Sequence, residues 1–212
     1  MNNISCKDNK NKKVNIAVLV SGGGTNLQAL INAQKNGIIK SGKIKLVVSS
    51  NKNAYALKRA QNSNIKTFVC ERKGLDQKEF EKNILTALNT ENIEIIVLAG
   101  FMSILSESFI KKYPNRIINV HPSLIPSFCG KGFYGLKVHK EALDYGVKVT
   151  GATVHFVNEV PDGGKIIMQK AVSINRNDTP ETLQKRVMEK AEWKILPKAA
   201  EKVCFELLKN KN

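Results

Sequence analysis

Apolar residues along this chain occur in short runs that alternate with segments of helical periodicity. Runs typical of buried strands lie at 15–20, 45–49, 66–70, 93–99 and 116–120. The intervening segments predict helices at 26–35, 54–63, 76–89 and 106–112, and Asp76 is a candidate helix cap. Strands that alternate with helices indicate an α/β fold, in which a mainly parallel sheet carries helices on both faces.

The alternation changes after residue 121. We expect a loop rich in Gly, Pro and aromatic residues, then a helix and two longer strands, at 122–134, 138–145, 148–157 and 165–174. A long helix near 180–208 follows, and a kink is expected at Pro197 because proline removes a backbone donor. The predicted fold class is α/β: a Rossmann-like, doubly wound and mostly parallel sheet with a C-terminal strand pair and a long C-terminal helix.

Residues 1–13 are polar and lysine-rich and predict a disordered tail, whereas 14–212 predict a single domain. The apolar run that follows the tail is too short for a signal peptide, and glycines stand in place of a cleavage site. No stretch approaches the length of a membrane span. The four cysteines have no metal-ligand spacing and fit a reducing, cytoplasmic location: Cys6, Cys70, Cys129 and Cys204.

The composition is strongly basic, since 34 Lys and Arg against 18 Asp and Glu give a net charge of +16. Such an excess attracts nucleic acid, phosphorylated metabolites and polyglutamate tails. The lysines are scattered, and no aromatic residues interleave with them as stacking platforms. This pattern favours a solvated basic surface. A non-catalytic nucleic-acid-binding protein is the alternative of a different class.

Candidate chemistry appears where the run 116–120 ends, in the sequence Asn-Val-His-Pro. Asn119 and His121 are two residues apart, so in a strand they point to the same face. A side-chain amide and an imidazole can both donate hydrogen bonds to a developing oxyanion, and the imidazole can also act as an acid or a base. Acyl transfer needs both of these functions. Two interpretations are open here: a reactive site, or a strand end with two polar residues that lead into a loop.

Segment 21–26, Ser-Gly-Gly-Gly-Thr-Asn, follows the first strand and opens the first helix. Glycines let a phosphate approach backbone N–H groups, and a helix N-terminus supplies positive potential. It is not a Walker loop, because no Gly-Lys-Ser/Thr follows, and Leu27 at the third glycine position makes it a poor dinucleotide site. A single bound phosphate is favoured over a plain strand–helix turn.

All three histidines, His121, His139 and His155, lie in one stretch of the second half. His139 and His155 are interpreted as structural, although His155 alternates along a strand and can sit behind the site. Asp162 precedes two glycines, which signals a turn. A neighbouring strand can still bring its carboxylate to His121, where it favours the protonated ring at neutral pH.

The strand at 93–99 leads into Gly-Phe-Met-Ser-Ile-Leu at 100–105. Ligands of open α/β sheets bind at the carboxyl ends of the strands. Phe101, Met102 and Ile104 therefore predict a flat apolar slot for a ring system, or alternatively packing under the next helix.

These segments together resemble the phosphoribosylglycinamide formyltransferase family, whose members are folate-dependent enzymes of purine synthesis. The likeness runs from about residue 15 to 197, in order and at compatible spacing. Asn-Val-His-Pro-Ser-Leu, the downstream Asp-Gly-Gly and the N-terminal glycine turn are specific jointly. The resemblance implies the formyltransferase fold, with a phosphate-binding N-terminal half and a folate-binding C-terminal half.

The resemblance also carries residue roles by position. The family's catalytic residues correspond to Asn119, His121 and Asp162. Its phosphate-binding turn corresponds to Gly24, Thr25 and Asn26. The acid on the ribose side of its substrate corresponds to Glu192. Its folate-binding residues correspond to Lys78, Met102, Ser103, Ile104, Leu105, Asn119, Asn158, Glu159, Val160, Pro161 and Asp162.

The implied reaction moves the formyl group of 10-formyltetrahydrofolate, as co-substrate and without a metal, to the amine of 5-phosphoribosylglycinamide. Asn119 and a protonated His121 would hold the tetrahedral oxyanion. Asp162 would keep His121 charged and help the proton to move from the amine to the leaving nitrogen. The implied partners are small molecules, with no nucleic acid or membrane, in a monomer or homodimer.

Some positions depart from the family pattern. Ser103 and Lys78 stand where some relatives carry Arg, Trp193 stands where His is common, and the loop at 127–137 is longer.

Two rivals share the catalytic residues. Formyltetrahydrofolate hydrolase would carry a regulatory domain ahead of this one, and methionyl-tRNA formyltransferase would carry a further RNA-binding domain, so the chain length disfavours both.

Overall fold

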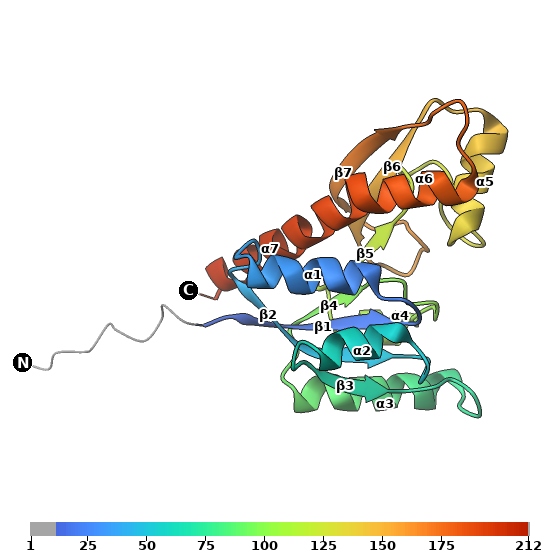
Figure 1. Cartoon of the computed structure of the whole chain (residues 1–212). Helices are drawn as coiled ribbons and strands as arrows, with labels where there is room; N and C mark the ends of the chain where they lie inside the picture. Colours follow the sequence, from blue (N-terminus) through green and yellow to red (C-terminus); the bar gives the residue numbers. More distant parts are fainter. Residues whose placement is uncertain (1–11, 212) are drawn as a thin grey trace, which may run out of the picture.

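The computed structural model describes residues 12–211, so most of the predicted tail lies outside the described residues. They form one sheet with helices on both faces, in the strand order β3-β2-β1-β4-β5-β6-β7 (Figure 1). The strands are β1 (Val14–Val20), β2 (Gly42–Ser49), β3 (Lys66–Val69), β4 (Ile95–Leu98), β5 (Ile117–His121), β6 (Val149–Phe156) and β7 (Ile166–Ser173). The helices are α1 (Thr25–Lys35), α2 (Tyr55–Gln61), α3 (Gln77–Thr90), α4 (Glu107–Ile110), α5 (Leu136–Tyr145), α6 (Pro180–Val187) and α7 (Trp193–Lys209).

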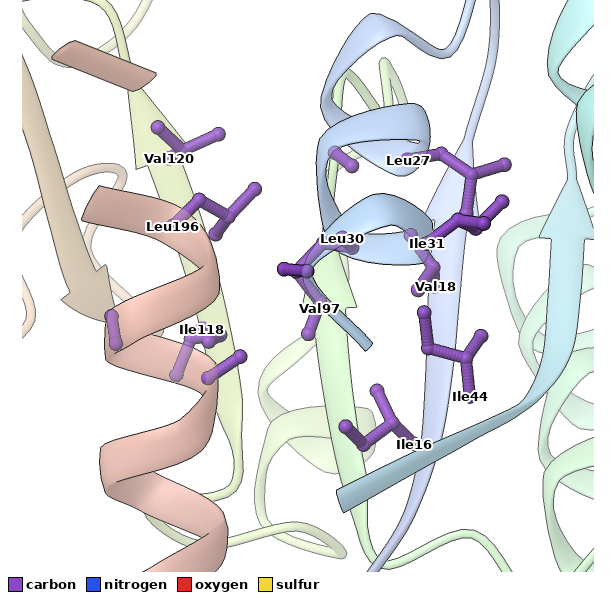
Figure 2. Close-up of a cluster of buried hydrophobic side chains, with 14 of the residues drawn as sticks. Ile16, Val18, Leu27, Leu30, Ile31, Ile44, Val97, Ile118, Val120 and Leu196 are labelled. Atoms are coloured by element: carbon purple, nitrogen blue, oxygen red, sulfur yellow. The ribbon is translucent and has the colours of Figure 1, made fainter. Parts of the chain in front are cut away.

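Strand β1 lies in the middle of the parallel part and pairs with β2 and β4. Its alternate residues enter two different apolar clusters, Val18 on one face and Leu19 on the other. Both faces are therefore buried, as a parallel sheet covered by helices requires. Figure 2 shows the first cluster, where Leu30 of α1 and Leu196 of α7 lie over the strands.

The last three strands form the antiparallel part of the sheet. β6 runs antiparallel to both β5 and β7, which confirms the C-terminal strand pair on a mostly parallel sheet. The register places Asn119 opposite His155 and His121 opposite Thr153. Strand pairing thus sets two histidines and an amide side by side at the end of β5.

The C-terminal helix differs from its prediction. α6 passes through a π-helical turn, η1 (Met188–Glu192), before α7 begins at Trp193. Pro197 lies inside α7, so the departure from α-helical geometry is upstream of the expected kink. A π turn holds one more residue than an α turn, and such turns occur often at functional sites. None of the helices in the described range 12–211 is long and apolar enough to cross a membrane.

Helix α5 contains a buried polar group. His139 is 1% exposed, and its Nε2 has no hydrogen-bond partner among residues 12–211. Burial, together with a positive charge on the nearby His121, lowers the pKa of His139 from 6.5 to about 4. His139 is therefore neutral in the folded protein at neutral pH.

We predict that the core depends on Phe80, which is fully buried in α3 and stacks on Phe101. Phe80→Ala should lower the free energy of unfolding by about 3–5 kcal/mol, because it removes apolar contacts and leaves a cavity. Phe205, which is 59% exposed, provides the matched control. Phe205→Ala should change stability by about 0.5 kcal/mol or less in the same urea titration. Equal losses in the two variants would contradict the assigned core.

We also predict that His139 makes stability depend on pH. Its pKa is lower in the folded chain, so between pH 6.5 and about 4 the unfolded chain binds a proton that the folded chain does not. Stability therefore falls as the pH decreases through this window, by at most about 3 kcal/mol from this residue. In His139→Leu, the free energy of unfolding should change less with pH across this window than it does in the wild-type protein. An unchanged course in the variant would refute the assignment.

Candidate active site

The carboxyl ends of β1, β4 and β5 meet at one edge of the sheet, which is where open α/β sheets bind ligands. β5 brings Asn119 and His121 to this edge. The loop after β6 returns toward the same place and carries Asp162, whose φ is +56°. Aspartate tolerates this left-handed conformation because its short polar side chain forms local hydrogen bonds.

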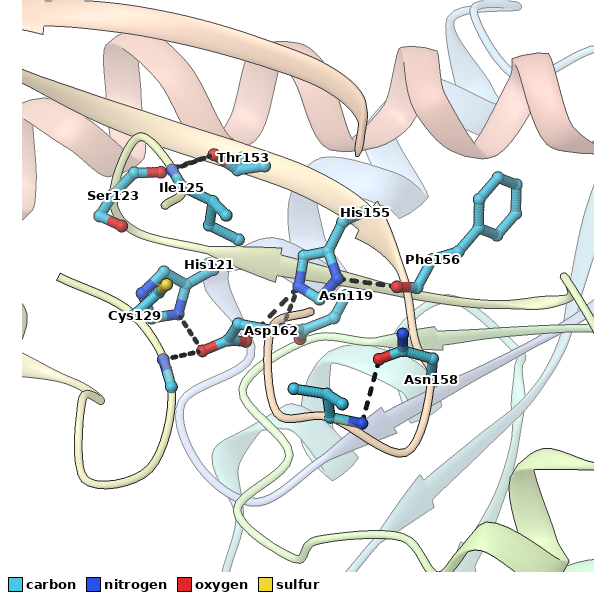
Figure 3. Close-up of polar contacts among 12 residues, drawn as sticks. Asn119, His121, Ser123, Ile125, Cys129, Thr153, His155, Phe156, Asn158 and Asp162 are labelled. Atoms are coloured by element: carbon cyan, nitrogen blue, oxygen red, sulfur yellow. Dashed lines mark hydrogen bonds and ion pairs between the residues drawn. The ribbon is translucent and has the colours of Figure 1, made fainter. Parts of the chain in front are cut away.

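The carboxylate of Asp162 lies between two imidazole rings (Figure 3). Its Oδ2 is 3.5 Å from Nδ1 of His121, and its Oδ1 is 3.5 Å from Nε2 of His155. The backbone N–H of Gly130 also donates to Oδ2, at 2.8 Å. Burial acts to raise the pKa of Asp162, but the contacts with His155, His121 and Gly130 outweigh it and leave the pKa below its ordinary value. Asp162 is therefore a carboxylate at neutral pH.

His121 is 4% exposed and has a polar partner on each ring nitrogen. Nε2 donates to the carbonyl oxygen of Phe128 at 2.8 Å, and Nδ1 faces Asp162. Burial lowers the pKa of His121, while the Phe128 carbonyl and the Asp162 carboxylate raise it, and burial has the larger effect. Asp162 does favour the charged ring, as predicted. Desolvation is nevertheless the stronger influence, so the expectation that Asp162 keeps His121 charged stays a prediction.

His155 takes a larger part in this cluster than the sequence indicated. Its Nδ1 donates to the carbonyl of Phe156 at 2.8 Å, and its Nε2 lies 3.3 Å from the amide nitrogen of Asn119. The amide nitrogen can only donate, so Nε2 is the acceptor in this contact, and the contact fixes which way the amide points. His155 thus orients Asn119 and contacts Asp162. The alternation of side chains along β6 was the signal for this placement.

The predicted phosphate turn follows β1, as expected. Gly24 has a φ of +71° and precedes α1 without a side-chain cap. The first N–H groups of a helix have no partner within that helix, so those at the start of α1 can bind an anion. Asn26 donates from Nδ2 to Oε2 of Glu192 at 2.6 Å, which brings the turn against η1. Burial raises the pKa of Glu192, and the bond from Asn26 opposes that shift.

A cavity of about 600 Å³ joins these groups. It is lined by Asn26 and Glu192 at one side and by Asn119, His121 and Asp162 at the other. The residues of segment 130–135 close part of its wall. Of the predicted catalytic, phosphate and ribose residues, five thus line one space: Asn119, His121, Asp162, Asn26 and Glu192. Gly24 and Thr25 lie outside this lining, and Thr25 lines a separate cavity of about 370 Å³.

A second cavity of about 150 Å³ continues from Asn119 and Asp162. Most of the predicted folate-binding residues line it: Ser103, Ile104, Leu105, Asn158, Glu159, Val160 and Pro161. Met102 lines the larger cavity and is 59% exposed. Lys78 is exposed on α3, outside the lining of both cavities, so the structure does not bring it to the predicted site.

Comparisons with known proteins agree with this geometry. The family model described as formyl transferase matches residues 14–200. A phosphoribosylglycinamide formyltransferase of Haemophilus influenzae is 40% identical over 183 residues, which are 86% of this chain and 83% of that protein. The crystal structure of a phosphoribosylglycinamide formyltransferase from Brucella melitensis superposes with a TM-score of 0.83 at 40% sequence identity. The match covers 91% of this chain and 96% of the Brucella melitensis chain.

A trifunctional purine biosynthetic protein of Gallus gallus is 45% identical over 193 residues. The match covers 91% of this chain but 18% of that longer protein, so the likeness concerns one part of it. The region that the family model matches contains β1 to β7 and the residues that line both cavities. The chain therefore belongs to the formyl transferase family.

Proposed function

We propose that this chain transfers the formyl group of 10-formyltetrahydrofolate to the amine of 5-phosphoribosylglycinamide, a step of purine biosynthesis. The observation that carries the proposal is the cavity that joins Asn26, at the start of α1, to the amide of Asn119, the imidazole of His121 and the carboxylate of Asp162. The names of the similar enzymes support the same choice of substrates. We expect a cytoplasmic monomer or homodimer whose partners are these small molecules.

The two cavities suit the two substrates. The phosphate would bind the N–H groups that begin α1 at Gly24, Thr25 and Asn26, and the ribose hydroxyls would face Glu192. The amine would then lie near Asn119, across the larger cavity. The folate would occupy the smaller, partly apolar cavity and bring its formyl carbon to the same point.

The chemistry follows from the groups at that point. The amine nitrogen attacks the formyl carbon, and the carbonyl bond opens to a tetrahedral oxyanion. An N–H of Asn119 donates to this oxygen, and we expect the Nε2 N–H of His121 to exchange its contact with the Phe128 carbonyl for a contact with the same oxygen. The negative charge that develops there raises the pKa of His121 and opposes the effect of burial. Asp162 accepts the proton that the amine loses and passes it to the leaving nitrogen, so that the C–N bond to the folate breaks and tetrahydrofolate departs.

The first test is the reaction itself. The protein is mixed with 5-phosphoribosylglycinamide and 10-formyltetrahydrofolate, and release of tetrahydrofolate is followed. We expect release that depends on both substrates. Equal release without the amine substrate would indicate a hydrolase instead. Release with methionyl-tRNA, but not with the ribonucleotide, would indicate the other rival.

We predict that Asn119→Ala and His121→Ala each lower kcat by about 10²–10³, the usual effect of removing an oxyanion donor. The reason is that both side chains face the cavity where the charge develops. Asn89→Ala, on the exposed face of α3, is the control and should keep wild-type turnover. Each variant's circular dichroism spectrum and urea midpoint are measured to confirm folding. Near-normal turnover in a folded Asn119 or His121 variant would rule out its assigned role.

A further inference from the structure

The phosphate turn is made of three successive glycines, and its shape depends on helix α2 packed beside it. The backbone N–H of Ala56 donates to the carbonyl of Gly22 at 3.1 Å. A Cβ at Gly24 would lie 2.6 Å from the Cβ of Ala56, so α2 packs directly against the turn. Apart from the adjoining residues of the turn, no atom of residues 12–211 lies within 4 Å of a Cβ built at Gly22 or Gly23, so there is space for a ligand beside these two glycines.

One charged side chain completes the contact between α2 and the turn. Arg59 donates from Nε to the carbonyl of Gly23 at 2.8 Å, and from Nη1 to Oε1 of Gln28 in α1 at 3.1 Å. Its guanidinium carbon also lies 4.9 Å from the centroid of the Tyr55 ring, a cation–π contact. The side chain is half-buried and thus held at three points.

Arg59 therefore connects the glycine turn to α1, the helix that begins directly after the turn. Gly23 lies before the left-handed Gly24, and Gln28 lies in the second half-turn of α1, so the guanidinium spans the segment that would hold the phosphate. Arginine suits this role because its planar donors are fixed relative to one another. Its permanent positive charge also adds to the potential at the start of α1.

We propose that Arg59 is a positioning residue for the substrate phosphate. It acts through Gly23 and Gln28, not by carrying out chemistry, and it prepares the turn to accept a phosphomonoester. This inference rests on the proposed phosphate site at Gly24, Thr25 and Asn26. Arg59 would affect only the binding of the phosphate of 5-phosphoribosylglycinamide. We therefore expect a change in KM for this substrate and not for 10-formyltetrahydrofolate.

The test compares Arg59→Gln, Arg59→Lys and Lys58→Gln. Lys58 is the matched control because it neighbours Arg59 on α2, is exposed, and lies 5.9 Å from the same Tyr55 ring without reaching the turn. The acceptors are 5-phosphoribosylglycinamide and its phosphate-free riboside. Thermal unfolding of each variant is measured first. The ratio of kcat/KM for the two acceptors within one variant is then independent of how much protein is folded.

Arg59→Gln should raise KM for the phosphorylated acceptor about tenfold, because the turn loses the charged donor that bonds Gly23 and Gln28 and is no longer held in the shape that accepts the phosphate. Its kcat, its KM for 10-formyltetrahydrofolate and its kcat/KM for the riboside should stay within about twofold of wild type. Arg59→Lys should lie close to Arg59→Gln, because an ammonium keeps the charge but loses the paired donors. Lys58→Gln should resemble wild type.

Three results would overturn the proposal: an unchanged KM in Arg59→Gln, wild-type behaviour of Arg59→Lys, or equal losses for both acceptors. A Lys58→Gln effect as large as that of Arg59→Gln would also overturn it, since a general charge effect would then suffice. Failure of the phosphate site itself gives a different result. Wild-type protein would then use the riboside as well as the phosphorylated acceptor, before any variant is considered.

Discussion

The carboxylate of Asp162 is the group on which the arrangement of the site depends. It contacts a histidine of β5, a histidine of β6 and the backbone of the loop after β5. Backbone pairing also joins β5 to β6, and Thr153 of β6 bonds the loop after β5 at Ser123 and Ile125, but Asp162 is the side chain that contacts all three elements beside the candidate reacting groups. A partly buried carboxylate is costly unless polar groups surround it, and here the Gly130 N–H donates to Oδ2 while an imidazole ring lies beside each oxygen. The same contacts that stabilise the charge therefore fix the geometry of the reacting groups.

Burial and charge act in opposite directions on His121, and the balance suits a group that must respond to its substrate. The carboxylate beside it favours the charged ring, but desolvation lowers the pKa further than the carboxylate raises it. A charge that appears at the formyl oxygen adds to the effect of Asp162 and shifts this balance. In the proposed reaction His121 would then stabilise the oxyanion more strongly than the neutral carbonyl, which is the requirement for catalysis.

Sequence reasoning succeeded where the signal is local. The period of two along β5 placed Asn119 and His121 on one face, and the glycine turn after β1 was visible from its residue types. The contact between His155 and Asn119 depends on the antiparallel register of β5 and β6, which no local pattern specifies. The carbonyl of Phe128 and the N–H of Gly130 belong to the backbone and leave no trace in residue identity. The residues of η1 are Met, Glu, Lys, Ala and Glu, all good helix formers, so residue type did not mark the π turn and a kink was instead expected at proline.

The sheet also explains how the two ends of one substrate can be held at a fixed separation. The phosphate turn follows β1, the catalytic pair ends β5, and β4 lies between these strands. Neighbouring strands are about 4.8 Å apart, so two spacings set roughly 10 Å between the turn and the amide. This span is fixed by backbone hydrogen bonds and two buried apolar faces, which resist change far more than loops do. Loops and side chains then need to adjust only the final contacts, through α2 and η1 at the phosphate end and Asp162 at the reacting end.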